Sequence, residues 1–125
     1  MKAGGFPREA RLLSGADFKR VFDARQVESN RYFRIHWAVR AAPEGGPVTG
    51  SPDGARLGLA IAKRVARRAV DRNRIRRVAR ETFRQRRHLL RPVDFVVLAK
   101  PPATEADSRT LKLALEQLWL RFESP

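Results

Sequence analysis

Three arginines spaced one helical turn apart are the strongest chemical signal in this sequence. Arg76, Arg80 and Arg84 recur every four residues, so they share one face of any helix that contains them. Like charges at that spacing destabilise a helix, whereas a face that serves only solubility usually alternates acids with bases. Guanidinium groups bind phosphates through paired hydrogen bonds and stack on nucleobases. The pattern therefore favours a surface that binds a polyanion, and we predict that the polyanion is structured RNA.

The segment from Lys63 to Arg91 carries most of the charge of the 125-residue chain. Thirteen cationic residues against two acidic ones give this segment +11 of the formal net charge of +14. Charge that only keeps a protein in solution would be spread over the whole surface. Such a concentration is typical of an electrostatic footprint for nucleic acid.

No set of side chains forms a catalytic or metal-binding pattern in the sequence. His36 and His88 stand alone, and the chain has no cysteine. Asp17 and Asp107 stand at expected helix starts, where helix capping explains them. We therefore expect no catalytic residue and no metal ligand. The absence of cysteine, of an N-terminal signal sequence and of a long apolar run favours a cytoplasmic protein.

The elements that must position the arginines follow from apolar periodicity. Ser14 is the expected cap of the first helix, with Leu13 and Phe18 as a hydrophobic staple. We predict one domain over 1–125 in the order α-β-β-α-β-α, with an N-terminal arm over 1–12 and a Pro- and Gly-rich loop over 41–55. The expected elements are a helix over 14–24, strands over 31–40 and 56–62, a basic helix over 67–87, a strand over 93–99 and a helix over 108–122.

The sequence leaves open what the outward sides of two strands bind. Tyr32, Arg34 and His36 share the side of a strand that faces away from the core, and either base stacking or simple solvation explains them equally well. The second strand carries only small residues on the same side (Gly58, Ala60 and Ala62), which would let a ligand backbone approach the sheet. Phe18 and Phe22 are core residues by default. The general rule for a strand–helix–strand connection predicts a right-handed crossover.

The basic segment resembles the signature of the bacterial ribonuclease P protein family. The carrying residues are the run RLGLAIAKR from Arg56 to Arg64, followed by RRAVDRNRIRR from Arg67 to Arg77, whose RNR core starts at Arg72. The sequences FPRE from Phe6 and DFVVLAK from Asp94 are also similar to the family pattern, so the resemblance covers nearly the whole chain. The loop over 41–55 departs from it.

The resemblance implies a fold and a function. The fold is an α/β (α+β) two-layer sandwich whose crossover through the basic helix is left-handed, against the general rule. The family's protein works with a catalytic RNA to remove the 5′ leader from precursor tRNA. Magnesium ions are expected to be held chiefly by the RNA, so the protein side chains bind no cofactor. The expected partners are these two RNAs, with no membrane and no obligatory protein partner.

The resemblance also assigns residues to two surfaces. The helix face that meets the catalytic RNA is expected to comprise Arg67, Arg68, Arg72, Asn73, Arg74, Arg76, Arg77 and Arg80. A cleft between the first helix and the open sheet face is expected to hold the single-stranded leader, with Phe18, Phe22, Arg34, His36, Gly58, Ala60 and Lys63 along it. Lys63, Arg67 and Arg68 stand near the start of the helix, within reach of either RNA.

Two other classes of protein share part of this pattern. A structural RNA-binding protein of ribosomal type would have the basic face but would need no cleft for a single strand. A DNA-binding protein is disfavoured because a buried strand follows the basic helix and the sequence shows neither helix-turn-helix spacing nor zipper heptads.

Overall fold

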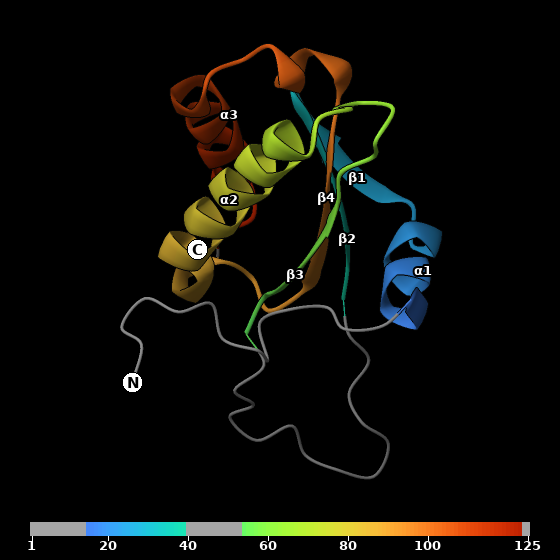
Figure 1. Cartoon of the computed structure of the whole chain (residues 1–125). Coiled ribbons are helices and arrows are strands. Elements are labelled where there is room, and N and C mark those ends of the chain that lie inside the picture. The colour runs from blue at the N-terminus through green and yellow to red at the C-terminus, as the bar shows by residue number, and fades with distance from the viewer. Residues whose placement is uncertain (1–14, 40–53, 124–125) are drawn as a thin grey trace, which may run out of the picture.

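The computed structural model describes residues 15–39 and 54–123. A four-stranded sheet packs against helices α2 (Ala69–Arg86) and α3 (Ser108–Leu120) on one face, and helix α1 (Gly15–Asp23) lies on the opposite face (Figure 1). The predicted helices are confirmed to within two residues at each end. The predicted cap of α1, the N-terminal arm and most of the 41–55 loop lie outside the described residues.

The sheet contains one strand more than the sequence predicted. Its order is β1-β2-β4-β3, with β1 (Gln26–Ser29), β2 (Phe33–Ala38), β3 (Arg56–Ala60) and β4 (Asp94–Ala99). β2 pairs antiparallel with β1 and β4, and β3 runs parallel to β4. β1 was missed because it is a four-residue edge strand without an apolar alternation. A tight turn reaches it through Arg25, which adopts a positive φ of 56°.

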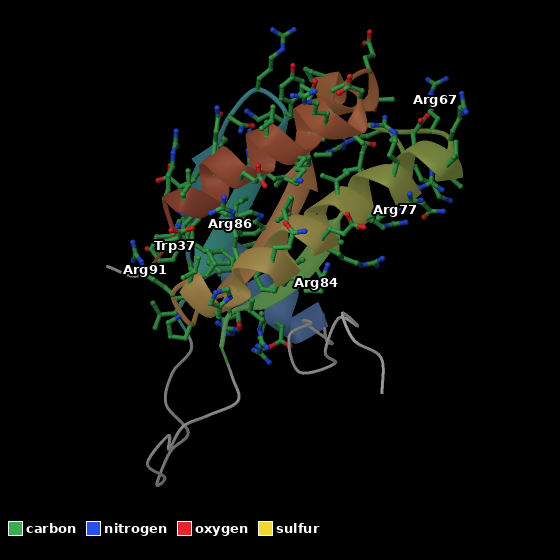
Figure 2. All side chains as sticks on the ribbon, turned by 90° about the vertical axis from the view of Figure 1, so that its left-hand side faces the viewer. Trp37, Arg67, Arg77, Arg84, Arg86 and Arg91 are labelled. Carbon is green, nitrogen blue, oxygen red and sulfur yellow. The ribbon has the colours of Figure 1, made fainter. Side chains whose placement is uncertain are left out.

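The crossover from β3 through α2 to β4 is left-handed, as the family resemblance implied. Seen from the helix side, both strands run in the same direction and β4 lies to the left of β3, beneath α2 (Figure 2). Leu57 on β3 and Phe95 on β4 turn their side chains to the same face, so the connection must cross on that face. Because β4 is inserted between β2 and β3, the crossover on this face takes the less common hand.

Most apolar side chains gather between the sheet and the two C-terminal helices, in what we call the main core. α2 contributes the apolar sector that its periodicity predicted, namely Ile75, Val78, Ala79, Thr82 and Phe83. Phe83, Phe95 and Trp119 pack as a triad of aromatic rings, with centroids 5.3–6.3 Å apart. The Trp119 indole N–H donates to the Thr82 hydroxyl, so these two buried polar groups are paired.

A second, smaller cluster lies between α1 and the other face of the sheet, and we call it the small core. Its buried members are Val21, Ala38 and Val96, and the half-buried Phe18, Phe22, Ala60 and Leu98 pack against them. At the other end of the domain, Asp107 caps α3 as predicted. Its carboxylate accepts a hydrogen bond of 2.7 Å from the Thr110 backbone N–H, which lowers the pKa of that carboxyl.

Candidate nucleic-acid interface

The outward side of α2 is a row of cations without counter-ions. Arg77, Arg80 and Arg84 are exposed, and none of them forms an ion pair or hydrogen bond with the part of the chain that the structure describes. Arg76 is half-buried, with only a long contact of 3.4 Å to the amide oxygen of Asn73. Figure 2 shows Arg77 and Arg84 along the helix and Arg67 just before its first turn. These guanidinium groups keep their donors available for an external anion.

Two arginines of the RNR sequence turn inward instead, which the sequence did not predict. Arg72 donates to the carbonyl oxygens of Ala66 and Arg67, at 2.9 and 2.8 Å. Arg74 donates to the carbonyl oxygens of Ala106 and Thr104, at 2.7 and 3.2 Å. Their guanidinium groups therefore hold two loops next to the start of α2, namely the loop that precedes the helix and the loop over 104–106. Helical periodicity places Arg74 on the polar side of α2 and leaves Arg72 at its boundary, but it cannot show the carbonyl acceptors that other segments supply.

The loop before α2 adds further exposed cations. Lys63, Arg64, Arg67 and Arg68 are exposed, and Arg68 lies 3.7 Å from Asp71 across the first helical turn. This loop joins the end of β3 to the start of α2. Its cations therefore stand near the start of α2, between the two surfaces that the family resemblance assigned to different RNAs.

The strand register places the remaining predicted residues on the face of the sheet that α1 partly covers. Arg34 on β2 lies opposite Leu98 on β4, which in turn lies opposite Ala60 on β3. One row nearer to the start of β4, His36 lies opposite Val96, and Val96 lies opposite Gly58. α1 packs on β2 and β4, and the Phe22 and His36 rings meet edge to face with centroids 4.9 Å apart.

The predicted residues on this face differ in how far their side chains are buried. Arg34 is exposed; His36, Phe18, Phe22 and Ala60 are half-buried; Gly58 is buried. Phe18 and Phe22 therefore serve the small core and the surface at the same time. The accessible row runs through Arg34, Leu98 and Ala60, toward the cationic loop that follows β3.

Tyr32 does not join this row, contrary to the alternation that placed it beside Arg34 and His36. It precedes the first residue of β2 and packs against the main core on the other side of the sheet. The Asn30 amide oxygen accepts hydrogen bonds from the Tyr32 and Phe33 backbone N–H groups, both at 3.0 Å. This turn interrupts the strand geometry, so the period of two does not extend back to Tyr32.

His36 has an unusual electrostatic environment. Burial lowers the pKa of its imidazole below the ordinary value, and the neighbouring Arg34 guanidinium lowers it further. Its Nδ1 atom is buried and has no hydrogen-bond partner among residues 15–39 and 54–123. A neutral imidazole next to an exposed guanidinium therefore forms the polar part of this face.

An ionic network holds α1 on the sheet, and the sequence did not predict it. The fully buried Asp94 carboxylate accepts two hydrogen bonds from Arg56, at 2.8 and 2.7 Å, and one from Arg20 of α1. Asp17 lies 3.8 Å from Arg20 and 3.7 Å from Arg56. Arg20 and Asp94 are 74 positions apart in the chain, and no local pattern could have paired them.

Over residues 15–39 and 54–123, no group of three or more His, Cys, Asp or Glu side chains is placed to hold a metal ion. In the same part of the chain, no helix is both long and apolar enough to cross a lipid bilayer.

Comparison with known proteins gives consistent matches over most of the chain. Residues 6–123 match the family described as Ribonuclease P. The ribonuclease P protein component of Thioalkalivibrio sulfidiphilus is 44% identical over 97% of this chain and 92% of its own, and that of Salmonella arizonae is 44% identical over 93% and 89%. The solved structure of the Staphylococcus aureus RNase P protein superimposes with a TM-score of 0.75 at 27% identity, over 90% of this chain and 93% of that one. The Thermotoga maritima RNase P protein gives 0.72 at 25% identity, over 91% and 98%.

Proposed function

The chain belongs to the ribonuclease P protein family, and we propose that it serves as the protein component of this tRNA-processing endoribonuclease through two surfaces that hold different RNAs. The catalytic centre of the enzyme lies in the RNA, so the protein contributes binding and orientation. The outward side of α2 binds the catalytic RNA. The sheet face beside α1 binds the single-stranded leader of precursor tRNA.

The observation that carries this proposal is the set of unpaired cations on α2. Arg77, Arg80 and Arg84 lie on one exposed face and have no acidic partner in the described part of the chain. Holding like charges together costs folding free energy, and a phosphate backbone offsets that cost when it binds. An A-form RNA helix presents phosphates and 2′-hydroxyl groups rather than readable bases in its grooves, which suits a row of guanidinium groups.

The sheet face beside α1 suits a different ligand. Arg34 can bind a phosphate, while Phe18, Phe22 and His36 form an aromatic border against which unpaired bases can stack. Ala60 has a short side chain, which allows a strand to approach the sheet closely. A single strand suits this face, because its unpaired bases can stack on the aromatic border.

We propose that the divalent cations of the enzyme are held chiefly by the RNA. No step of the reaction is assigned to a side chain of this protein.

The test compares two variants on two RNAs. Arg80→Gln should weaken binding of the catalytic RNA and reduce the slope of log K against log salt by about 0.7–0.9, the value for one lost phosphate contact. It should leave the ratio of affinities for precursor and mature tRNA unchanged in the reconstituted enzyme.

Ala60→Leu should do the reverse. The larger side chain would occupy the accessible row, and the precursor-to-mature affinity ratio should fall about five- to a hundredfold, the equivalent of one lost stacking contact. Because Ala60 touches the small core, a melting curve must first show that the variant folds. An unaltered ratio in a folded Ala60→Leu protein would remove the leader from this face, and an unaltered salt slope for Arg80→Gln would return that arginine to a solubility role.

A further inference from the structure

A pocket of about 370 Å³ lies away from both proposed surfaces, between the turn that precedes β2 and the 3-10 helix η3 (Pro101–Thr104). Its lining residues are Arg31, Tyr32, Pro101, Pro102, Glu105 and Ala106. The volume falls within the range of small-ligand sites in proteins. None of these residues belongs to the row beside α1 or to the outward side of α2.

Hydrogen bonds from three directions hold the walls of the pocket. The Lys100 backbone N–H donates to the Tyr32 carbonyl oxygen at 2.8 Å, and the Lys100 ammonium group donates to the Asn30 carbonyl oxygen at 2.6 Å. Arg74 of α2 holds the carbonyl oxygen of Ala106, and the Asn30 amide group donates to the Ala114 carbonyl oxygen of α3. The pocket is thus formed before any ligand arrives, which reduces the ordering cost of binding.

The lining has the chemistry of a nucleobase site. The Arg31 guanidinium carbon lies 5.8 Å from the centre of the Tyr32 ring, so a planar cation and a planar ring meet at one wall. The two prolines add flat apolar surface without any backbone N–H to satisfy. The exposed Glu105 carboxylate supplies acceptors for an exocyclic amino group.

The charges that line the pocket favour a nucleobase over a phosphate group as its ligand. Arg31 and Glu105 cancel in net charge, so the pocket does not concentrate anions as the side of α2 does. A phosphate would be repelled by Glu105, whereas a base carries no charge to repel.

We infer that this pocket binds an unpaired nucleobase of the catalytic RNA. The inference rests on the proposed function, since Arg74 ties the pocket wall to the same helix whose outward side meets that RNA. Phosphate contacts on α2 position the RNA, and the base pocket adds a contact that reads an unpaired nucleotide. The ligand class is a nucleobase with an exocyclic amino group, which Glu105 can accept.

The test uses the full-length protein and the catalytic RNA. Tyr32→Leu removes the ring but keeps an apolar side chain, and it should weaken binding by about five- to a hundredfold, the range for one lost stacked base. The slope of log K against log salt should not change, because no phosphate contact is lost. Tyr32→Phe keeps the ring and should bind like the wild type.

Two further measurements separate the pocket from a folding effect. Glu105→Gln changes an exposed side chain and should weaken binding severalfold with an unchanged melting temperature. Ultraviolet irradiation of the complex should yield an RNA adduct on the peptide that contains Tyr32, detected by mass spectrometry. If folded Tyr32→Leu and Glu105→Gln proteins bind the RNA like the wild type, and the adduct is absent, the base pocket is refuted. Arg80→Gln measured in the same series tests the proposed function separately, because its salt slope does not depend on the pocket.

Discussion

The two faces of one sheet are used in opposite ways. On the side of α2 and α3, large aromatic side chains such as Phe83, Phe95 and Trp119 are fully buried against one another. On the side of α1, the small core has three fully enclosed residues, and its remaining members stay half-exposed. The first face supplies the hydrophobic free energy of folding, whereas the second retains accessible surface for a ligand.

The small core is supplemented by charge. Asp94 is fully buried and binds both Arg20 and Arg56, whose side chains remain 38% and 24% exposed. Asp17 lies within 4 Å of both arginines, so in the described part of the chain each arginine is near two carboxylates. A buried ion pair adds little net stability over apolar packing, but it fixes geometry because removing one partner leaves the other unpaired. The ionic network thus fixes the position of α1, which makes few apolar contacts with the sheet.

The largest expected effect comes from the main core. Phe83→Ala should lower the free energy of unfolding by about 3–5 kcal/mol, because it removes a ring that packs against Phe95 and Trp119 and leaves a cavity. Below the melting temperature, the precursor-to-mature affinity ratio of the reconstituted enzyme should stay at the wild-type value. Chemical denaturation and tRNA binding measure the two quantities, and a changed ratio in the folded variant would show that the faces are coupled.

A smaller loss of stability with a larger functional effect is expected from Asp94→Asn. Breaking a buried pair costs roughly 3–5 kcal/mol, and we expect about 2–3 kcal/mol here because both guanidinium groups reach water. α1 would lose its fixed position, so the precursor-to-mature ratio should fall while affinity for the catalytic RNA is kept.

The matched control is Asp23→Asn on the same helix. Asp23 pairs with Lys19 four residues earlier, and both side chains are exposed. Its removal should change stability by less than about 0.5 kcal/mol and leave both affinities unaltered. A similar loss in the two variants would mean that the position of α1 does not depend on the buried network.

The contrast between a residue that supports the fold and one that binds RNA can also be tested within α2. Arg74→Met should cost about 1–2 kcal/mol of stability, because charged hydrogen bonds to the Ala106 and Thr104 carbonyl oxygens are lost. Arg77→Met should change stability by less than about 0.5 kcal/mol but reduce the salt slope for the catalytic RNA by about 0.7–0.9. Equal stability losses in the two proteins would contradict the division into inward and outward arginines.

Local patterns in the sequence were enough for much of this molecule. The apolar sector of α2 follows from its helical period, and the Asp107 cap follows from residue type at a helix start. The mixed fold and the exposed cations of α2 could therefore be predicted. The left-handed crossover came from the family resemblance, since it depends on the insertion of β4 between β2 and β3.

Features that depend on distant partners could not be predicted. The inward turn of Arg72 and Arg74 depends on backbone carbonyl groups of neighbouring loops. The link between Arg20 and Asp94 joins the first helix to the last strand. Tyr32 was misplaced because strand alternation was extended one residue before the strand begins. Long-range contacts explain the positions of Arg74 and Arg20, whereas a local turn at Asn30 explains that of Tyr32.

The smallest expected effect is a pH dependence at His36, on the α1 side of the sheet. Burial holds the pKa of this imidazole below its ordinary value of 6.5, with Arg34 acting in the same direction. Above that value the side chain is neutral in both the folded and the unfolded chain, so it adds no pH dependence. As the pH falls below 6.5, the unfolded chain binds a proton first, and the folded state loses stability until the pH passes below the folded pKa. Between pH 7.5 and 5.5 the melting temperature of the wild type should therefore fall more than that of His36→Gln. At pH 7.5 the two proteins should show the same slope of log K against log salt for precursor tRNA, because a neutral imidazole neutralises no phosphate. Parallel melting profiles would show that His36 is as solvated as an ordinary surface histidine, and a lower salt slope for His36→Gln would show that it is charged in the complex.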